Sequence, residues 1–337
     1  MEHAKFLRVA RIKRLLASTA QPGQGPRSYR LPSLPAQLLQ RNKVRHSVPL
    51  GVCARVVVPT STHEEMSALE SQRKALRNSR FVLKIHNGAD ANQFPLAQAE
   101  ALESLARQGI ACPVDHQRGV YLQDHFVRLL DYVPGELLFH HPHKTLEMYF
   151  ALGEFLAGVD IGLKASHVAD KHDVVKSREL QWDLRYFAQL EFFVNSLSEQ
   201  GQRQVCLNTL REFAKLNSEK FQLGLVHNDA NDRNLLVMAE GGGFAIIDFG
   251  DMVYTWLVSE VAIAMAYVVV GWFTDHPSDG DGVWLDRVGA LFKGYRAIVP
   301  LSPQEVDALE RGLFTRARQA RLGLARGIGQ GGQDRFR

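Results

Sequence analysis

The chain has 337 residues, of which 45% are hydrophobic and 23% are charged, which are the proportions of a globular protein with a sizeable core. Its net charge of +4 is modest, and its three cysteines lie far apart without a CxxC pair. This pattern excludes a disulfide-rich secreted scaffold and a cysteine zinc site. The most apolar stretch, 258–272, contains a serine and a glutamate, so we expect a buried helix and no membrane span.

The first 45 residues carry ten lysines and arginines against a single acid, Glu2. Apolar residues between positions 6 and 16 can share one face of a helix. A basic, acid-poor amphipathic start is typical of a mitochondrial transit peptide, and the alternative is a basic tail outside the mature domain. Few aromatic residues accompany these charges, so no nucleic-acid partner is expected. We assign residues 1–46 to a basic tail or targeting segment.

The next part of the chain favours strands. Alternating apolar residues predict four of them, at 54–58, 80–85, 119–122 and 125–130. Helical spacing predicts one helix at 94–108, which ends at Gly109. The sequence DYVPG at 131–135 then breaks the pattern and predicts a hinge.

Beyond that hinge the periodicity is mainly helical. It predicts helices at about 144–165, 178–199, 201–217, 254–272, 282–298 and 302–325. A strand–turn–strand interrupts them at 235–247, where the glycines at 241–243 form a tight turn. We therefore expect an α+β chain of two lobes, 47–135 and 136–326, with a disordered tail at 327–337 and a small-molecule site between the lobes.

The strongest functional signal is the pattern H-x-D-x4-N-x13-D-F-G, which begins at His227. Asp229 can orient a hydroxyl and accept its proton during phosphoryl transfer. Asn234 offers a neutral amide oxygen and Asp248 a charged oxygen for a Mg²⁺ ion that neutralises phosphates. We expect His227 to brace the loop through backbone hydrogen bonds. Each residue alone could be an ordinary loop or cap residue, but their joint spacing indicates a kinase site.

Lys84 lies within an apolar strand and can reach nucleotide phosphates as a point charge. The alternative is an edge-strand lysine that prevents aggregation. A carboxylate from the following helix is expected to hold such a lysine. Glu100 and Glu103 are the candidates, and Glu100 is preferred.

These stretches resemble the aminoglycoside phosphotransferase and choline kinase family, which is related to the protein kinases, and within it the hydroxylysine kinases. Four segments carry the resemblance: 81–85 (FVLKI), 125–135 (HFVRLLDYVPG), 227–234 (HNDANDRN) and 247–252 (IDFGDM). It extends from about residue 81 to residue 267. The resemblance implies a protein-kinase-like fold with a small β-rich N-lobe and a larger helical C-lobe.

The resemblance also implies roles for particular residues. Asp229 would be the base, while Asn234 and Asp248 would bind Mg²⁺. Lys84 would contact the nucleotide phosphates. The backbone between Asp131 and Val133 would form the hinge that bonds the purine.

The reaction implied is transfer of the γ-phosphate of GTP, or of ATP, to the hydroxyl of 5-hydroxy-L-lysine or a similar amino alcohol in the cytoplasm. Asp232 and Asp251 lie within the motif, and we expect them to meet an ammonium group of such a substrate.

The sequence departs from the family pattern at both ends. A phosphate-covering turn is expected before Val56, where 49–51 (PLG) is the only candidate, and the final helices end early, after Leu324. Two alternatives therefore stay open. One is a catalytically impaired, kinase-like nucleotide-binding module, and the other is a kinase for another alcohol such as homoserine, choline or an aminoglycoside.

Overall fold

The computed structural model describes residues 80–86, 93–115, 119–122, 125–180, 183–186, 194, 199–216, 218–239, 242–275 and 282–309. The predictions for residues 1–46, 49–51, 54–58 and 327–337 lie outside the described residues. Contacts divide the chain into two compact units. Unit 1 comprises Met1–Pro95 and Asp115–Tyr132, and unit 2 comprises Leu96–Val114 and Val133–Arg337. The domain boundaries expected from the sequence stay predictions.

The described part of unit 1 holds a three-stranded antiparallel sheet in the order β1-β3-β2. The strands are β1 (Phe81–His86), β2 (Val120–Leu122) and β3 (His125–Asp131). Alternate residues of a strand point to one face, so Phe81 and Leu83 pack with Val127 and Leu129 in one apolar cluster. The predictions of strands at 80–85, 119–122 and 125–130 were confirmed.

Unit 1 also contains a buried ion pair that the sequence did not indicate. Arg128 on β3 is fully buried, and its Nε donates to Asp115 Oδ2 at 2.7 Å. Burial lowers the pKa of Arg128, and the charge of Asp115 and its hydrogen bond raise it. Arg128 stands opposite Lys84 in the β1–β3 register, so Asp115 supplies a negative charge beside a strand pair that carries two cations.

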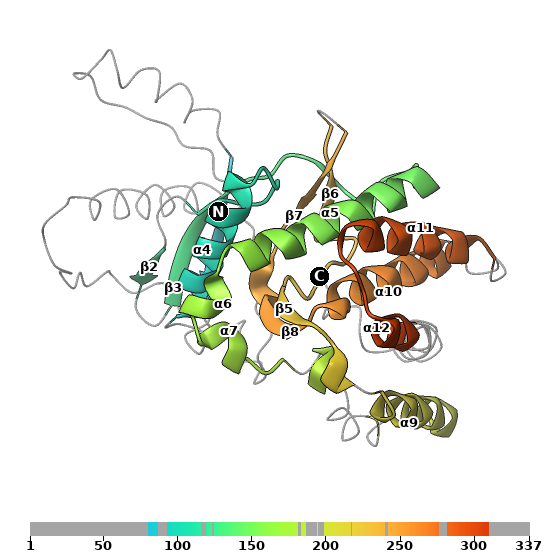
Figure 1. The fold of residues 1–337 in the computed structure, drawn as a ribbon. Helices are drawn as coiled ribbons and strands as arrows, with labels where there is room; N and C mark the ends of the chain where they lie inside the picture. The colour runs from blue at the N-terminus through green and yellow to red at the C-terminus, as the bar shows by residue number, and fades with distance from the viewer. Residues whose placement is uncertain are drawn as a thin grey trace, which may run out of the picture. The chain divides into compact units, whose positions relative to one another are not determined.

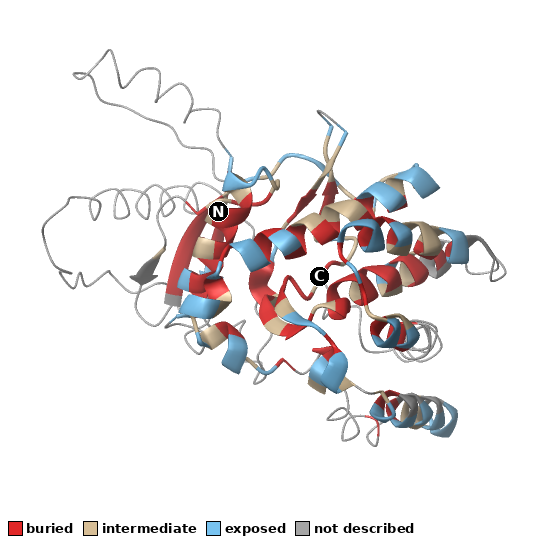
Figure 2. Ribbon diagram, in the orientation of Figure 1, coloured by how far each residue is buried: buried red, intermediate tan, exposed pale blue. Residues whose placement is uncertain are grey.

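Unit 2 is built mainly from helices. They are α4 (Phe94–Arg107), α5 (Leu146–Ala165), α6 (Val168–Lys171), α7 (Val174–Ser177), α9 (Gln200–Ala214), α10 (Val258–Asp275), α11 (Gly282–Ile298) and α12 (Pro303–Ala308). Figure 1 shows α5, α10 and α11 packed side by side. Figure 2 shows that buried residues concentrate where these three helices meet, whereas α9 is largely exposed.

Two glycines let α5 and α11 approach closely. A Cβ atom at Gly153 would overlap the carbonyl oxygen of Leu291, and one at Gly294 would overlap the carbonyl oxygen of Phe150. Backbone therefore packs directly against backbone, and this contact fixes how α11 presents Tyr295 and Arg287.

Five short strands complete the described part of unit 2. A sheet of order β4-β6-β7 contains β4 (Glu136–Leu137), β6 (Leu235–Val237) and β7 (Phe244–Ile246), and a separate pair joins β5 (Leu223–Val226) to β8 (Val253–Trp256). The predicted hairpin at 235–247 was confirmed, whereas β4, β5 and β8 were not predicted. Short 3₁₀ turns lie at η4 (Ser218–Lys220) and η5 (Phe249–Asp251).

Two helix predictions need correction. The helix expected at 254–272 begins only at Val258, because the β-branched and aromatic residues of β8 pair with β5 instead. The helix expected from residue 178 does not start there, since Arg178 has an extended backbone. Much of 178–199 lies outside the described residues. Within the described ranges, no helix combines the length and the apolar character needed to span a bilayer.

Candidate active site

The sequence motif folds into two neighbouring loops of unit 2. The first loop, 227–234, joins β5 to β6, and the second follows β7. Leu235 pairs with Ile246 in the β6–β7 hairpin, and Ile247 N donates to Asn234 O at 2.9 Å. That bond extends the ladder by one residue, so Asn234 and Asp248 lie at the same end of the hairpin.

Asp229 is half-buried, and amide groups hold both of its carboxylate oxygens. Asn231 Nδ2 donates to Oδ1 at 2.8 Å, and Asn234 Nδ2 donates to Oδ2 at 2.7 Å. Asn234 Nδ2 also lies 2.9 Å from the carbonyl oxygen of Asp229. These bonds fix the carboxylate in one orientation.

Burial raises the pKa of the Asp229 carboxyl group to about 7. The hydrogen bonds from Asn231 and Asn234 lower it, while the charges of Asp251 and Asp248 raise it. Three carboxylates thus repel one another here, and a nearby cation would offset that repulsion.

His227 and Asn228 set the backbone conformation at the start of the first loop. His227 is fully buried, and its Nε2 donates to Ile247 O at 2.9 Å while its Nδ1 accepts from Asp229 N at 3.2 Å. Its ring also contacts Phe249 edge to face. Asn228 has a positive φ of 66°, which turns the chain sharply before the acid. Each ring nitrogen of His227 therefore makes one backbone hydrogen bond, one in each of the two loops.

Three buried acidic groups lie beneath this loop. Glu260 Oε2 on α10 accepts from Asn228 N at 2.8 Å, and Tyr295 on α11 donates its hydroxyl to Asp160 Oδ2 on α5 at 2.5 Å. Burial raises the pKa of Asp160 well above its ordinary value, and the charge of Glu260 raises it further. Burial likewise raises the pKa of Glu260 to about 7. Glu260 thus joins the first loop to α10, and the Tyr295–Asp160 bond joins α11 to α5.

The second loop is held by contacts within unit 2. Asp248 has a positive φ of 61°, and its Oδ1 accepts from Gly250 N at 3.3 Å. Arg178 Nη1 donates to Gly250 O at 3.0 Å and to Met252 O at 2.9 Å, and Gln98 Nε2 donates to Phe249 O. No local sequence pattern marks Arg178 or Gln98, because both donate to backbone carbonyls from positions far away in the sequence.

The donor set at the hairpin end fits a magnesium ion. Mg²⁺ is commonly held by one or two carboxylates together with substrate phosphates and water. The Asn234 amide nitrogen is committed to Asp229, so its oxygen is the atom left for a cation, and Asp248 adds a charged oxygen. In the described part of the chain, no group of three or more His, Cys, Asp or Glu side chains is arranged to hold a metal. The one amide oxygen and one carboxylate of this site fit an ion that would take its other ligands from water or phosphate.

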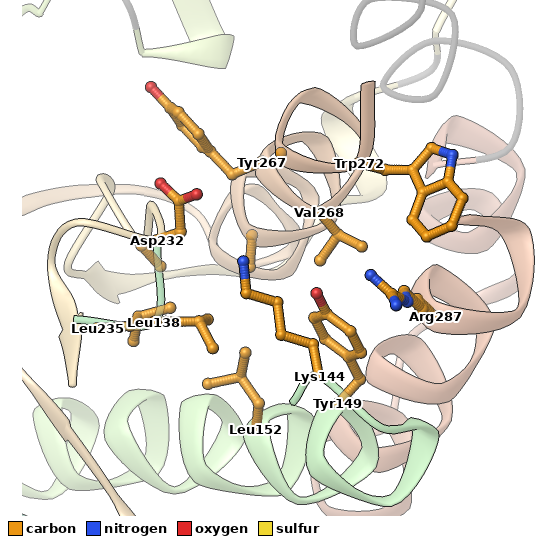
Figure 3. Close-up of a pocket in the computed structure, with 13 residues that line it drawn as sticks. Leu138, Lys144, Tyr149, Leu152, Asp232, Leu235, Tyr267, Val268, Trp272 and Arg287 are labelled. Carbon is orange, nitrogen blue, oxygen red and sulfur yellow. The ribbon is translucent and has the colours of Figure 1, made fainter. Parts of the chain in front are cut away.

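A pocket opens beside the first loop, entirely within unit 2 (Figure 3). Its lining includes three charged side chains, Lys144, Asp232 and Arg287, and three aromatic ones, Tyr149, Tyr267 and Trp272. Leu138, Leu152 and Val268 supply apolar wall. Of the two acids predicted to meet a substrate, Asp232 lines the pocket and Asp251 is not part of its lining.

The other predicted site residues are distributed over both units. Lys84 is buried on β1 and Asp131 ends β3, both in unit 1. Val133 begins the second segment of unit 2, and Glu100 lies on α4 in that unit. Glu100 Oε2 is 3.2 Å from His172 Nε2 and 3.9 Å from Lys171 Nζ. The roles predicted for these four residues stay predictions.

Sequence reasoning missed most of the pocket. Lys144, Arg287 and Trp272 come from three different elements, so no local spacing marks them. Only the charge of Arg287 within an amphipathic helix could have drawn attention to it.

Comparisons with known proteins provide independent evidence on the family of this chain. A family model described as the phosphotransferase enzyme family matches residues 63–298, more than half of the chain. Hydroxylysine kinase of Mus musculus is 28% identical over 207 residues, which cover 58% of this chain and 52% of that protein. Hydroxylysine kinase of Danio rerio is 23% identical over 282 residues, covering 77% of this chain and 75% of that protein.

The alignments with the mouse and Bos taurus proteins span about half the length of those relatives. A solved structure of amicoumacin kinase hAmiN, in complex with AMP-PNP, Ca²⁺ and Ami, matches with a TM-score of 0.53 at 19% identity. That match covers 73% of this chain and 74% of the other, and it shows a shared fold.

Proposed function

Because the chain belongs to the phosphotransferase enzyme family, we propose that it is a metal-dependent small-molecule kinase that phosphorylates the hydroxyl group of an amino alcohol. The preferred acceptor is 5-hydroxy-L-lysine, which is supported by the similarity to hydroxylysine kinases. The observation that carries the proposal is the fixed Asp229 carboxylate, held through both oxygens at the hairpin end that also presents Asn234 and Asp248.

In this proposal Asp229 orients the acceptor hydroxyl and takes its proton as the new oxygen–phosphorus bond forms. The hydrogen bonds from Asn231 and Asn234 each use one lone pair of a carboxylate oxygen, and each oxygen keeps another for the substrate. His227 and Glu260 act as positioning residues, because they hold the loop and touch no reacting atom.

Asn234 and Asp248 would hold Mg²⁺, which supplies positive charge that neutralises the phosphates. Lys84 would contact the phosphates, with Glu100 as its carboxylate partner. The backbone at Asp131 and Val133 would bond the purine. These nucleotide contacts rest on the resemblance, and substitution of Lys84 by Met with measurement of nucleotide affinity tests them directly.

The donor is proposed to be GTP, with ATP as the alternative. A competition experiment in which equal concentrations of both nucleotides and Mg²⁺ meet one acceptor decides between them. Preferential formation of GDP supports GTP as the donor, and preferential formation of ADP contradicts it.

An acceptor panel tests the function itself. The purified chain is incubated with Mg²⁺, each nucleotide, and hydroxylysine, homoserine, choline, ethanolamine or an aminoglycoside. We expect hydroxylysine-dependent formation of nucleoside diphosphate and a product heavier by one phosphoryl group in mass spectrometry. Phosphorylation of another alcohol but not of hydroxylysine would contradict the proposed acceptor and leave the kinase function intact. Nucleotide binding without any transfer would favour the alternative of a kinase-like binding module.

We propose the cytoplasm as the compartment, with mitochondria as the alternative that the basic segment 1–46 favours. Sequencing the amino terminus of the mature protein from cells tests this. An intact Met1 region counts against mitochondrial import.

A further inference from the structure

The pocket beside the catalytic loop carries opposite charges on different elements. Asp232 belongs to the loop that contains the base, whereas Arg287 lies on α11 and Lys144 directly precedes α5. In the view of Figure 3, Asp232 lies on one side of the pocket and Arg287 with Trp272 on the other. A ligand of one uniform charge would be repelled at one of these ends.

Arg287 is placed by aromatic rings. Its guanidinium carbon lies 4.6 Å from the centroid of the Trp272 ring and 5.7 Å from that of Tyr149. Among the described residues, no carboxylate forms an ion pair with this half-buried guanidinium. An arginine that packs against aromatic rings keeps its planar fork of N–H donors for a carboxylate.

Asp232 lines the pocket on the side opposite Arg287 in the view of Figure 3. Gly271 of α10 lies beside it, since a Cβ atom placed there would be in van der Waals contact with Asp232 Oδ2, at 3.5 Å. Asp232 is three residues from Asp229 in the same loop. A carboxylate so close to the base suits an ammonium group on the carbon next to the reacting hydroxyl.

We propose that Arg287 recognises the carboxylate of an α-amino acid acceptor in this pocket and that Asp232 recognises the ammonium group nearest the hydroxyl. The proposal rests on the proposed kinase function and specifies its substrate class. Leu138, Leu152 and Val268 line the space for the methylene chain between the two charged ends. Acceptors without a carboxylate, such as choline and ethanolamine, would leave the Arg287 guanidinium without a counter-charge.

Calorimetry tests the charge recognition without turnover. L-lysine lacks the hydroxyl group and cadaverine lacks both the hydroxyl and the carboxylate, so neither is phosphorylated by this reaction. In the presence of Mg²⁺ and a non-hydrolysable nucleotide, we expect L-lysine to bind at least about tenfold more tightly than cadaverine. Equal affinities, or tighter binding of cadaverine, would overturn the proposal.

Substitutions test whether Arg287 causes the preference for L-lysine over cadaverine. Arg287→Met is expected to reduce the affinity ratio to about one without weakening cadaverine binding, since only the carboxylate contact is lost. Arg296→Met, at an exposed position on the same helix, should keep the wild-type ratio. If Arg287→Met retains the ratio, the carboxylate is bound elsewhere and the proposal fails.

Arg287 also packs on Trp272, so Arg287→Met could unfold the pocket. Thermal melting detects unfolding of the variant. If Arg287→Met is unfolded, Arg287→Lys replaces it in the binding experiment, because lysine keeps the positive charge but lacks the planar fork of donors. We expect Arg287→Lys to lower the ratio at least about threefold, and an unchanged ratio would contradict the proposal.

Kinetics separate this inference from the proposed function. Arg287→Met should raise KM for hydroxylysine with little change in kcat, and should leave KM for 1,5-diaminopentan-2-ol, the decarboxylated analogue, unaltered. If the wild type phosphorylates only acceptors without a carboxylate, the kinase function stands and the carboxylate inference falls. If it phosphorylates none, the proposed function fails, while the binding ratio still decides the recognition of the carboxylate.

Discussion

The side-chain amide nitrogen of Asn234 lies 2.7 Å from Asp229 Oδ2 and 2.9 Å from the carbonyl oxygen of the same residue. This one amide therefore fixes the proposed base from two directions. Because the amide nitrogen of Asn234 is hydrogen-bonded to Asp229, the amide oxygen is the atom that could bind a cation together with Asp248. In the proposed mechanism, proton acceptance and metal binding are therefore linked through a single side chain.

Replacing Asn234 by Asp tests that link. The substitution removes the donor to Asp229 and adds a fourth carboxylate beside Asp229, Asp248 and Asp251. We expect kcat to fall about 100-fold or more, since positioning and charge both change. Steady-state kinetics over a range of Mg²⁺ concentrations measure the effect. Asn208→Asp, on the exposed face of α9, is the matched control, and a loss of less than threefold at Asn234 would contradict the link.

The buried cluster of Asp160, Glu260 and Tyr295 predicts how stability depends on pH. Burial raises the folded-state pKa of Glu260 to about 7 from an ordinary 4.5 and raises that of Asp160 well above its ordinary value. The folded state then binds more protons than the unfolded state in this window. The free energy of unfolding should therefore decrease as pH rises from about 4.5 through 7, by up to about 1.4 kcal/mol per unit of pKa shift.

Asp160→Asn should flatten that decrease, because it removes one buried acid and the charge interaction with Glu260. An Asn oxygen can still accept the hydrogen bond from Tyr295. Urea unfolding at pH 5, 6, 7 and 8 measures the slope. Asp286→Asn, at an exposed position on α11, provides the comparison. The same slope in wild type and Asp160→Asn would rule out Asp160 as one of its sources.

The α5–α11 contact predicts opposite effects of the same substitution on one helix. Gly153→Ala would drive a methyl group into the backbone of α11, where Tyr295 N lies 2.6 Å from the added atom. We expect a loss of about 2 kcal/mol or more, as in other overpacked interiors. Gly158→Ala meets no atom within 4 Å and should stabilise the helix by about 0.5–1 kcal/mol.

Chemical denaturation of both variants measures the two changes. A Gly153→Ala protein as stable as Gly158→Ala would show that the helices do not approach closely at this point.

The elements with a strong local signal were predictable. The period of apolar residues located β1, α4, α5, α9 and α11, and the glycine turn located the β6–β7 hairpin. The α+β class and the resemblance to the family were confirmed. The strands β5 and β8 were not predicted, because each has only four residues and forms a strand by pairing with a partner that is distant in sequence.

The residues of the candidate site also differ in how far the sequence reveals them. Asp229, Asn234 and Asp248 occur in one short segment, so their spacing revealed them. Arg178 reaches the second loop from a position far away in sequence, and Asp160 meets Tyr295 only through the packing of α5 on α11. Arg287 enters the pocket through the same helix packing. Periodicity gives the face of a helix that is buried, but it does not give the residue that this face will meet.

The most direct test of the kinase proposal is the rate of hydroxylysine-dependent nucleoside diphosphate formation by Asp229→Asn beside the wild type. The substitution keeps the size of the side chain and removes its ability to accept the hydroxyl proton. We predict a kcat lower by about 10²–10⁴-fold, with nucleotide affinity and melting temperature close to wild type. A folded Asp229→Asn protein that transfers phosphate within about threefold of the wild-type rate would contradict the assignment of Asp229 as the base.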